Sequence, residues 1–334
     1  MSSITRMATL ACVLVCLACT PATQPTRDPG SPAGPSSSAA PQQPTAGTPS
    51  IPSPEPTPTP STTRKPTQTN SSLPRGGREV FPRYRLVGYA GLTGAKTLGR
   101  LGTGKLDQRV TEMERRAKPY AAGRQIMPVL EVITTIVQGS AGRDHEYRVR
   151  LSDARIGTYL KVARRHRAML LLNIQPGRAA FIDEARAYRR WLEQPDVGLA
   201  LDPEWAMDAH QVPGRVFGHT TGAELNQVAA YLSDLVAGKK LPEKVLVYHQ
   251  LAPRIVRRES GLKAHRGVVL IKSVDGIGQR AAKINTYRRV NETTPRHVHP
   301  GFKLFYTEDQ KSGHLMTPKQ VLALRPRPEY VLYE

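Results

Sequence analysis

Apolar residues between positions 81 and 334 occur in short runs separated by amphipathic segments. The runs are too short for buried helices, and most are closed by Gly, Pro or a charged residue, which is typical of strands buried in a sheet. This pattern predicts eight strands, at residues 85–91, 127–136, 169–175, 197–204, 215–219, 244–251, 268–274 and 302–307.

Each predicted strand is followed by a helical pattern or by a loop of helical character. These segments cover residues 105–120, 153–166, 179–193, 221–236, 253–259, 278–290 and 317–324, and Ser152 is a plausible N-cap of the second. Strands that alternate with helices imply right-handed crossovers and a parallel sheet. Eight such units in about 250 residues predict an α/β fold, a single closed (β/α)8 barrel of the TIM type over residues 80–334.

An open, doubly wound sheet is the alternative architecture. Such sheets often bind phosphate through a G-x-G-x-x-G loop that follows the first strand. The glycines of Gly99-Arg-Leu-Gly-Thr-Gly104 do not have this spacing, and no predicted strand precedes them directly. The closed barrel is therefore the preferred interpretation.

The N-terminal residues follow a different pattern. A single Arg6 precedes an apolar run over residues 7–19, which is too short to span a bilayer but typical of the core of a secretory signal. Leu17-Ala18-Cys19 resembles a bacterial lipoprotein signal, in which the cysteine carries the lipid. Residues 1–19 are therefore predicted to be a signal with Cys19 as the anchor, placing the protein on the extracytoplasmic face of the cell membrane. Cys12 is a second candidate anchor, and an ordinary signal with secretion is the alternative.

Residues 20–79 are predicted to be a disordered linker. Fifteen of the 29 prolines lie between Pro21 and Pro74, among Ser, Thr, Ala and Gln, and this composition buries too little apolar surface to fold. All three cysteines lie in the leader, so the domain has no disulfide, no thiolate metal site and no cysteine nucleophile. No cofactor is expected.

The chain is strongly basic, with a formal net charge of +21. Its basic residues are dispersed along helices rather than clustered with aromatic residues, and no nucleic-acid-binding motif is present, so nucleic acid is not an expected partner. An exported basic protein meets anionic lipid headgroups and acidic wall polymers instead. A solvated basic surface without a specific partner is the simpler interpretation of the charge.

Polar residues gather where the predicted strands end, which is where (β/α)8 barrels carry their chemistry. Those singled out are Glu131, Gln175, Asp202, Glu204, Trp205, His219, His249, Gln250, Asp275, Tyr306 and Glu308. Several carboxylates with Gln, His, Tyr and a nearby Trp describe a polar cleft with an aromatic platform, suited to a polyhydroxylated ligand.

The segment Val197 to Trp205 is the most informative. If the strand continues through Pro203, Asp202 and Glu204 point to the same side, roughly 6–7 Å apart along the backbone, as an acid/base pair. In the simpler interpretation, Asp202 opens the following loop and Glu204 is a solvated loop residue.

The chain resembles a family of largely uncharacterised lipoproteins from high-GC Gram-positive bacteria. The leader, the spacer and the blocks Gly99-Arg-Leu-Gly102, Asn173-Ile-Gln-Pro-Gly177, Gly198-Leu-Ala-Leu-Asp-Pro-Glu-Trp205 and Val274-Asp-Gly-Ile-Gly278 carry this resemblance. Leu201-Asp-Pro-Glu204 is similar to the acidic fourth-strand motif of chitinase-type barrel glycosidases, in which the Glu is the general acid. Only Asp202 and Glu204 match the row of acids in that motif.

This second resemblance implies a glycoside hydrolase that acts on a polysaccharide or another cell-wall polymer. Glu204 is the expected proton donor, and Asp202, Asp275 or Glu308 the nucleophile, base or stabilising carboxylate. The expected substrate-binding residues are Trp205, Gln175, His249, Gln250, Tyr306, Glu308 and Glu131. A non-catalytic envelope protein that binds glycan or anionic polymer is the alternative, because a fold alone does not establish catalysis.

Other groups of residues are candidates for a metal site or a serine hydrolase triad. A metal-dependent hydrolase requires His249 or His219 to converge with Asp202 and Asp275. His297 and His299 have the spacing of a two-histidine metal site but precede the last predicted strand, away from the expected cleft, so no metal is assigned. Ser273, with His249 and Asp275, supplies the residue types of a hydrolase triad, but no G-x-S-x-G elbow presents the serine.

Overall fold

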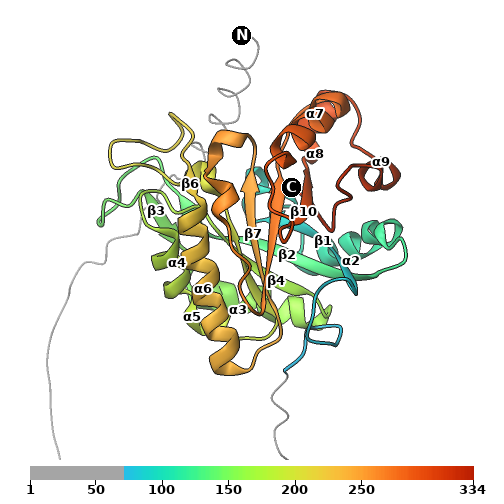
Figure 1. The fold of residues 1–334 in the computed structure, drawn as a ribbon, viewed down its shortest axis with the longest axis horizontal. Coiled ribbons are helices and arrows are strands. Elements are labelled where there is room, and N and C mark those ends of the chain that lie inside the picture. Colours follow the sequence, from blue (N-terminus) through green and yellow to red (C-terminus); the bar gives the residue numbers. More distant parts are fainter. Residues whose placement is uncertain (1–70) are drawn as a thin grey trace, which may run out of the picture. The chain divides into compact units, whose positions relative to one another are not determined.

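The computed structural model describes residues 71–334 and forms a closed barrel of eight parallel strands (Figure 1). The barrel strands are β1 (Tyr84–Gly91), β2 (Gln125–Val137), β4 (Met169–Ile174), β5 (Val197–Leu201), β7 (Lys244–Gln250), β9 (Val268–Val274), β10 (His299–Leu304) and β11 (Tyr330–Tyr333). Pairing of β1 with both β2 and β11 closes the sheet. The predicted (β/α)8 fold class is confirmed.

Helices cover the outside of the barrel, with α3 to α6 on one flank in Figure 1 and α2, α7, α8 and α9 on the other. They are α2 (Leu106–Ala117), α3 (Asp153–Arg165), α4 (Phe181–Ala187), α5 (Arg189–Leu192), α6 (Gly222–Lys239), α7 (Arg280–Asn291), α8 (Tyr306–Lys311) and α9 (Pro318–Leu322). Single 3-10 turns lie at Lys96–Leu98, Arg100–Gly102, Lys118–Tyr120, Pro203–Trp205, Pro253–Ile255 and Glu259–Gly261. The connection from β7 to β9 therefore has 3-10 turns at the place of the helix predicted over residues 253–259.

Short strands lie outside the barrel. The strand β3 (Arg148–Arg150) pairs antiparallel with the end of β2, and β6 (Thr220–Thr221) pairs with β8 (Val256–Arg257). The helix α6 begins with a capping box between Thr221 and Glu224, as its polar start favours. Ser152 occupies the N-cap position of α3, but its side chain makes no capping hydrogen bond.

One of the eight predicted strands is wrong, and one barrel strand was missed. Residues 215–219 do not join the barrel. The amides of Gly218 and His219 donate instead to the carbonyl oxygens of Glu204 and Ala206, at 2.7 and 3.0 Å, so the chain folds back beside the end of β5. The eighth barrel strand is β11, which lies beyond the last predicted helix. The predicted sixth, seventh and eighth strands are thus the fifth, sixth and seventh of the barrel.

Two apolar layers hold the fold together. Alternate residues of each strand point inward. Below the C-terminal ends of the strands, the barrel interior is filled by Leu86, Met127, Val129, Leu171, Ala200, Val245, Val247, Ile271 and Leu332. The outward-facing residues pack against the helices in a second, larger cluster. Polar side chains replace the apolar ones toward the C-terminal ends of the strands, where the interior row includes Glu131, Asn173, His249 and Lys303.

The predicted signal and its anchor Cys19 lie outside the described residues, as does most of the predicted linker. Residues 71–79, which the sequence assigned to the linker, already contact the fold: Leu73 is buried, and Arg78 Nη2 donates to the carbonyl oxygens of Lys240 and Leu241. Within residues 71–334, no helix has the length and apolarity needed to cross a membrane.

Candidate active site

The end of β5 differs from its predicted geometry. The strand stops at Leu201, and Pro203–Trp205 form a 3-10 turn, so Asp202 and Glu204 do not project from one extended strand. The expectation of two carboxylates on one strand face is therefore wrong. Glu204 is not a solvated loop residue either, because it is only 9% exposed, and Asp202 is 5% exposed.

Asp202 belongs to a buried polar cluster inside the C-terminal end of the barrel. Asn173 Nδ2, on β4, donates to Asp202 Oδ1 at 3.0 Å and to Glu131 Oε1, on β2, at 3.1 Å. Gln175 Nε2 donates to Asp202 Oδ2 at 3.2 Å. Amide side chains thus connect the carboxyl groups of two different strands.

His249 on β7 lies between two other carboxylates. Its Nε2 is 2.9 Å from Glu131 Oε1, and its Nδ1 is 2.8 Å from Asp275 Oδ2, just beyond β9. Lys303 Nζ, on β10, donates to Asp275 Oδ2 at 3.1 Å, and Tyr330 OH, on β11, donates to Glu131 Oε2 at 2.7 Å. The cluster therefore draws on seven of the eight barrel strands, or on the residues just beyond them.

The cations of the cluster decide which acids ionise. Burial alone raises the pKa of Asp275, but the charges of His249 and Lys303 outweigh burial and hold that pKa below its usual range. Burial also raises the pKa of Glu131, but the charge and the hydrogen bond of His249 outweigh burial, so this pKa is lowered. The two carboxylates in turn raise the pKa of His249 well above its usual value, against the effect of burial, so both ring nitrogens carry protons and donate.

Asp202 and Glu204 behave in the opposite way. Burial raises the pKa of Asp202, whose nearest cationic atom in the cluster, His249 Nε2, is 3.9 Å from Oδ1. Burial, reinforced by the charges of Asp202 and Asp275, raises the pKa of Glu204 to about 8. Glu204 Oε2 is buried and has no hydrogen-bond partner among residues 71–334. At neutral pH, Glu204 is therefore protonated, and none of the described residues forms a hydrogen bond with its Oε2.

Trp205 follows Glu204 directly, and its side chain is partly exposed. Gln250, at the end of β7, is buried and donates through Nε2 to the carbonyl oxygens of Ala252 and Pro253, at 3.3 Å each. Its Oε1 has no hydrogen-bond partner among the described residues.

Tyr306 and Glu308 are not brought to the cluster. Both lie on α8 rather than at a strand end, because β10 stops at Leu304. The Tyr306 hydroxyl is 3.0 Å from that of Tyr89, and its ring lies between the guanidinium groups of Arg100 and Arg116 on the outside of the barrel. This placement differs from the cleft position that the sequence predicted.

The sequence did not single out Lys303 or Tyr330 as candidate site residues. Lys303 lies within a predicted strand, and a lysine in an otherwise apolar strand is a signal that could have found it. Tyr330 lies on the strand that was missed, so its position at the cluster had no counterpart in the predicted barrel.

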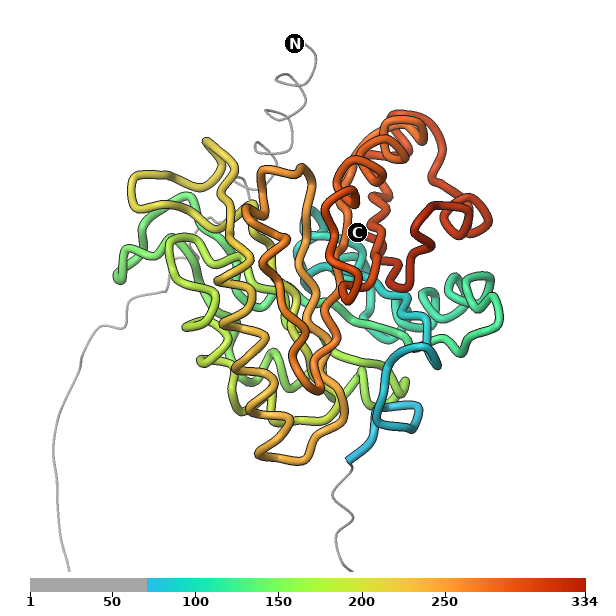
Figure 2. Tube along the Cα trace, viewed as in Figure 1, coloured from blue at the N-terminus to red at the C-terminus, as the bar shows by residue number. Residues whose placement is uncertain are grey.

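Three loops border the cluster on the side of β2, β4 and β5. The guanidinium group of Arg178, after β4, stacks at 4.3 Å on the ring of Tyr147 and donates to the carbonyl oxygen of Gln211 at 2.9 Å. Figure 2 shows the loop after β2 in green and the loop after β5 in yellow, side by side at the upper left. Arg178 thus connects the loop after β4 with the loops that follow β2 and β5.

Neither the metal site nor the serine triad that the sequence raised as alternatives is formed among the described residues. Among residues 71–334, no group of three or more His, Cys, Asp or Glu side chains has the geometry of a metal site. His219 lies 3.9 Å from Asp208 and not beside Asp275, and His299, at the start of β10, contacts Glu329. Ser273 Oγ donates to Asp275 Oδ1 at 3.0 Å rather than to His249, so it is not arranged as a triad nucleophile.

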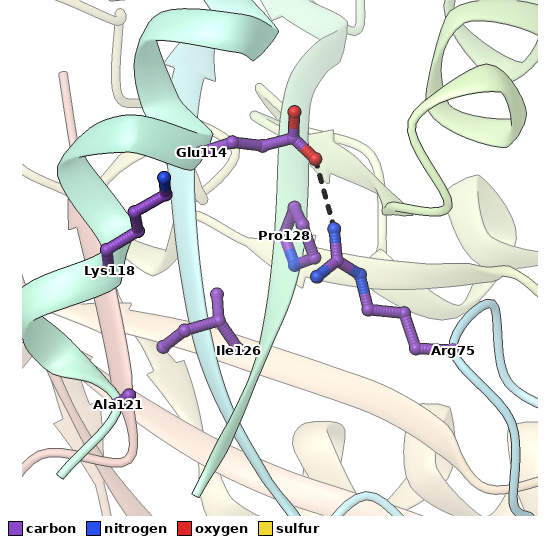
Figure 3. Close-up of a pocket in the computed structure, with 6 residues that line it drawn as sticks. All are labelled: Arg75, Glu114, Lys118, Ala121, Ile126 and Pro128. Atoms are coloured by element: carbon purple, nitrogen blue, oxygen red, sulfur yellow. Dashed lines mark hydrogen bonds and ion pairs between the residues drawn. The ribbon is translucent and has the colours of Figure 1, made fainter.

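A separate cavity of about 460 Å³ lies between α2 and the beginning of β2 (Figure 3). Ile126 and Pro128, from the beginning of β2, line it together with Lys118 and with the ion pair of Arg75 and Glu114, which is 3.0 Å long. Because the cluster lies where the strands end, this cavity is not part of the candidate site.

No protein-family model and no curated protein matches the chain. Among solved structures, a GH18 chitinase from Pseudoalteromonas aurantia is similar over 75% of this chain and 93% of its own, with 9% sequence identity and a TM-score of 0.32. A likeness this low does not bear on activity, and the barrel rests on the strand pairing of the chain itself. The resemblance to lipoproteins of high-GC Gram-positive bacteria stays a prediction.

Proposed function

We propose that the protein is a glycoside hydrolase that acts on a polysaccharide, with Glu204 as the proton donor. The observation that carries this proposal is the state of Glu204, a buried carboxylic acid with a pKa of about 8 and an unpaired Oε2. A general acid for glycosidic bond cleavage must hold its proton at working pH and release it to the leaving oxygen. Glu204 meets the first requirement by burial, and its free oxygen fits the second.

The neighbouring carboxyl groups have a complementary role in this reaction. Cleavage develops positive charge on the sugar ring, which nearby carboxylates stabilise. Asp275 is held ionised by His249 and Lys303, and Asp202 accepts hydrogen bonds from two amides. Asp202 and Asp275 are therefore the groups proposed to stabilise that charge or to act as base, with Gln175, Glu131 and His249 positioning them.

The decisive experiment compares Glu204→Gln with the wild type on a panel of wall and storage polysaccharides. Glutamine keeps the shape of the side chain but has no transferable proton, so turnover is expected to fall by roughly 10²–10⁴ while glycan affinity changes little. The exposed Glu292 gives a matched control, because Glu292→Gln makes the same chemical change far from the cluster and leaves turnover unchanged. Wild-type turnover that survives Glu204→Gln contradicts the assignment.

A non-catalytic glycan-binding protein is the second candidate. The observation that favours it is that two amides hold Asp202 and two cations hold Asp275, which fixes both carboxylates in hydrogen bonds within the protein. This function predicts that wild-type protein binds glycan but releases no sugar from any member of the panel. Binding that is unchanged in Glu204→Gln, together with no turnover, decides in its favour.

We further propose that the domain works at the outer face of the cell membrane, held there by lipid on Cys19. The sequence pattern around Leu17-Ala18-Cys19 and the proline-rich stretch that follows support this placement. Cys19→Ser should abolish labelling by a fatty-acid probe and leave an unprocessed precursor. Labelling that persists in the variant, or that is lost instead in Cys12→Ser, contradicts the assignment.

A further inference from the structure

The polar cluster contains more acids than bases. Its carboxyl groups belong to Glu131, Asp202, Glu204, Asp275 and Glu334, and its cations are His249 and Lys303. Lys303 Nζ contacts Asp275 at 3.1 Å and Glu334 at 2.5 Å, and His249 contacts Glu131 and Asp275. Both cations are therefore committed to other acids, and neither lies within hydrogen-bond distance of Asp202 or Glu204.

A hydrogen-bond acceptor is also left without a donor in the cluster. Both printed contacts of the Asn173 amide are made by Nδ2, which donates to Glu131 and Asp202 and so fixes the orientation of the group. Asn173 is 2% exposed, and its Oδ1 is buried without a hydrogen-bond partner among the described residues. An amide oxygen can only accept, and an unpaired buried acceptor destabilises the fold. The cluster thus lacks a donor for this oxygen close to Asp202, whose nearest cationic atom, His249 Nε2, is 3.9 Å away and is shared with Glu131.

We infer that this end of the barrel binds a sugar unit carrying a free ammonium group, which donates to Asp202 and to Asn173 Oδ1. The inference rests on the proposed function, because it names the substrate class of the same site. An ammonium group carries three N–H donors and one positive charge, so it supplies both of the missing features. A neutral sugar supplies donors but no charge, and an N-acetylated sugar has a single amide N–H at this position.

Such a ligand is compatible with proton donation by Glu204. Without the ligand, burial raises the pKa of both Asp202 and Glu204. An ammonium group beside Asp202 favours its ionised form, so binding releases a proton from the protein. The negative charge of Asp202 and the positive charge of the ligand then offset each other at Glu204, which keeps its own proton.

Isothermal titration calorimetry on the full chain at pH 6 tests the inference. The probes are a β-1,4-linked glucosamine oligosaccharide, the N-acetylated oligosaccharide of the same length, a cello-oligosaccharide and calcium chloride. The glucosamine oligosaccharide is expected to bind about tenfold or more tightly than either other sugar, because a hydrogen bond to a charged group is stronger than one between neutral groups. Titration in two buffers of different ionisation enthalpy should show proton release with this ligand alone.

Asp202→Asn should remove both the preference and the proton release, while Asp183→Asn, on the exposed face of α4, should change neither. If the variant does not fold, the proton count of the wild type decides. Equal or tighter binding of the N-acetylated or neutral sugar overturns the inference, and so does calcium that competes with the glucosamine oligosaccharide.

The inference and the proposed function fail in different ways. Glu204-dependent cleavage of a neutral glycan, without preferential binding of the glucosamine oligosaccharide, removes the ammonium assignment and leaves the glycosidase. Absence of both binding and cleavage removes both.

Discussion

The two ends of the barrel both bury charged side chains but pair them differently. At the N-terminal end, Arg85 on β1 donates to the carbonyl oxygens of Tyr120 at 2.6 Å and Pro328 at 3.2 Å. Lys244, at the start of β7, donates to the carbonyl oxygen of Val197 at 2.7 Å. These buried cations therefore donate to backbone carbonyl oxygens rather than to acids.

At the C-terminal end, acids outnumber bases, and the amide oxygen of Asn173 and Oε2 of Glu204 are unpaired. Unpaired buried acceptors and protonated acids lower the stability of a fold, and a protein keeps such features where function requires them. The difference shows that burial of charge alone does not identify a functional end. The excess of acids over bases, together with unpaired acceptors beside those acids, distinguishes the C-terminal end, and the following predictions test this contrast.

The largest expected effect on stability is at Lys303, the cation that pairs with two acids of the C-terminal end. Lys303→Met leaves the buried Asp275 without one of its two cationic partners and Glu334 without its own. Removing one member of a buried ion pair typically costs about 3–5 kcal/mol, so the urea midpoint should fall sharply. Lys311→Met, an exposed position on α8, is the control and should be nearly neutral. A loss below about 1 kcal/mol would mean that the cluster does not need this charge.

Glu204→Gln should change the stability in the opposite direction to Lys303→Met and stabilise the protein. The folded pKa of about 8 lies above the unfolded value, so the folded state holds the extra proton, and its stability falls as pH rises from about 4 toward 8. Glutamine does not titrate, so the advantage of the variant should grow by about 3 kcal/mol between pH 5 and pH 8. Thermal unfolding at both pH values measures it, with Glu292→Gln as the control. An advantage that is independent of pH contradicts the raised pKa.

The sequence was sufficient for the fold class because each buried strand and the helix that follows it leave a local pattern. It failed at residues 215–219, where Val216 and Phe217 suggest a strand but Gly214 and Gly218 allow the chain to fold back. Gly214 has a φ of +83°, and a side chain at Gly218 would meet Ala206 O at 1.9 Å. It also failed at β11, whose four residues follow two prolines and leave only a weak strand signal.

The candidate site was predictable to the extent that it follows strand ends. Glu131, Gln175, Asp202, Glu204, His249 and Asp275 were all expected there, and all lie in or beside the cluster. Glu204 was expected to be the proton donor, but the ionisation of the other acids was not predictable, because it depends on which cation contacts which acid. Lys303 pairs with Asp275 across 28 positions of sequence, and no local pattern encodes that contact.

Lys244 provides the reverse pH dependence at the other end of the barrel. Burial lowers its pKa to about 7, below the unfolded value, so the stability of the wild type rises as pH increases from 7 toward 10. Lys244→Met removes this titration and leaves carbonyl oxygens unpaired. Relative to the wild type, the variant should therefore lose about 2 kcal/mol between pH 7 and pH 9, measured by urea unfolding at each pH. A constant difference would show that Lys244 stays charged.

The smallest expected effect on stability is at Trp205, which follows Glu204 and is partly exposed. Trp205→Ala should change the free energy of unfolding by less than about 1 kcal/mol but weaken glycan affinity roughly tenfold, because the ring offers a stacking surface. Trp191 is the matched comparison: it is buried on α5, and its Nε1 donates to Asp153 Oδ1 at 2.8 Å. Trp191→Phe should lose about 1 kcal/mol of stability through that hydrogen bond and keep full affinity. Calorimetric titration and urea unfolding of both variants separate the two roles, and equal affinity losses would show that Trp205 is not a platform for the ligand.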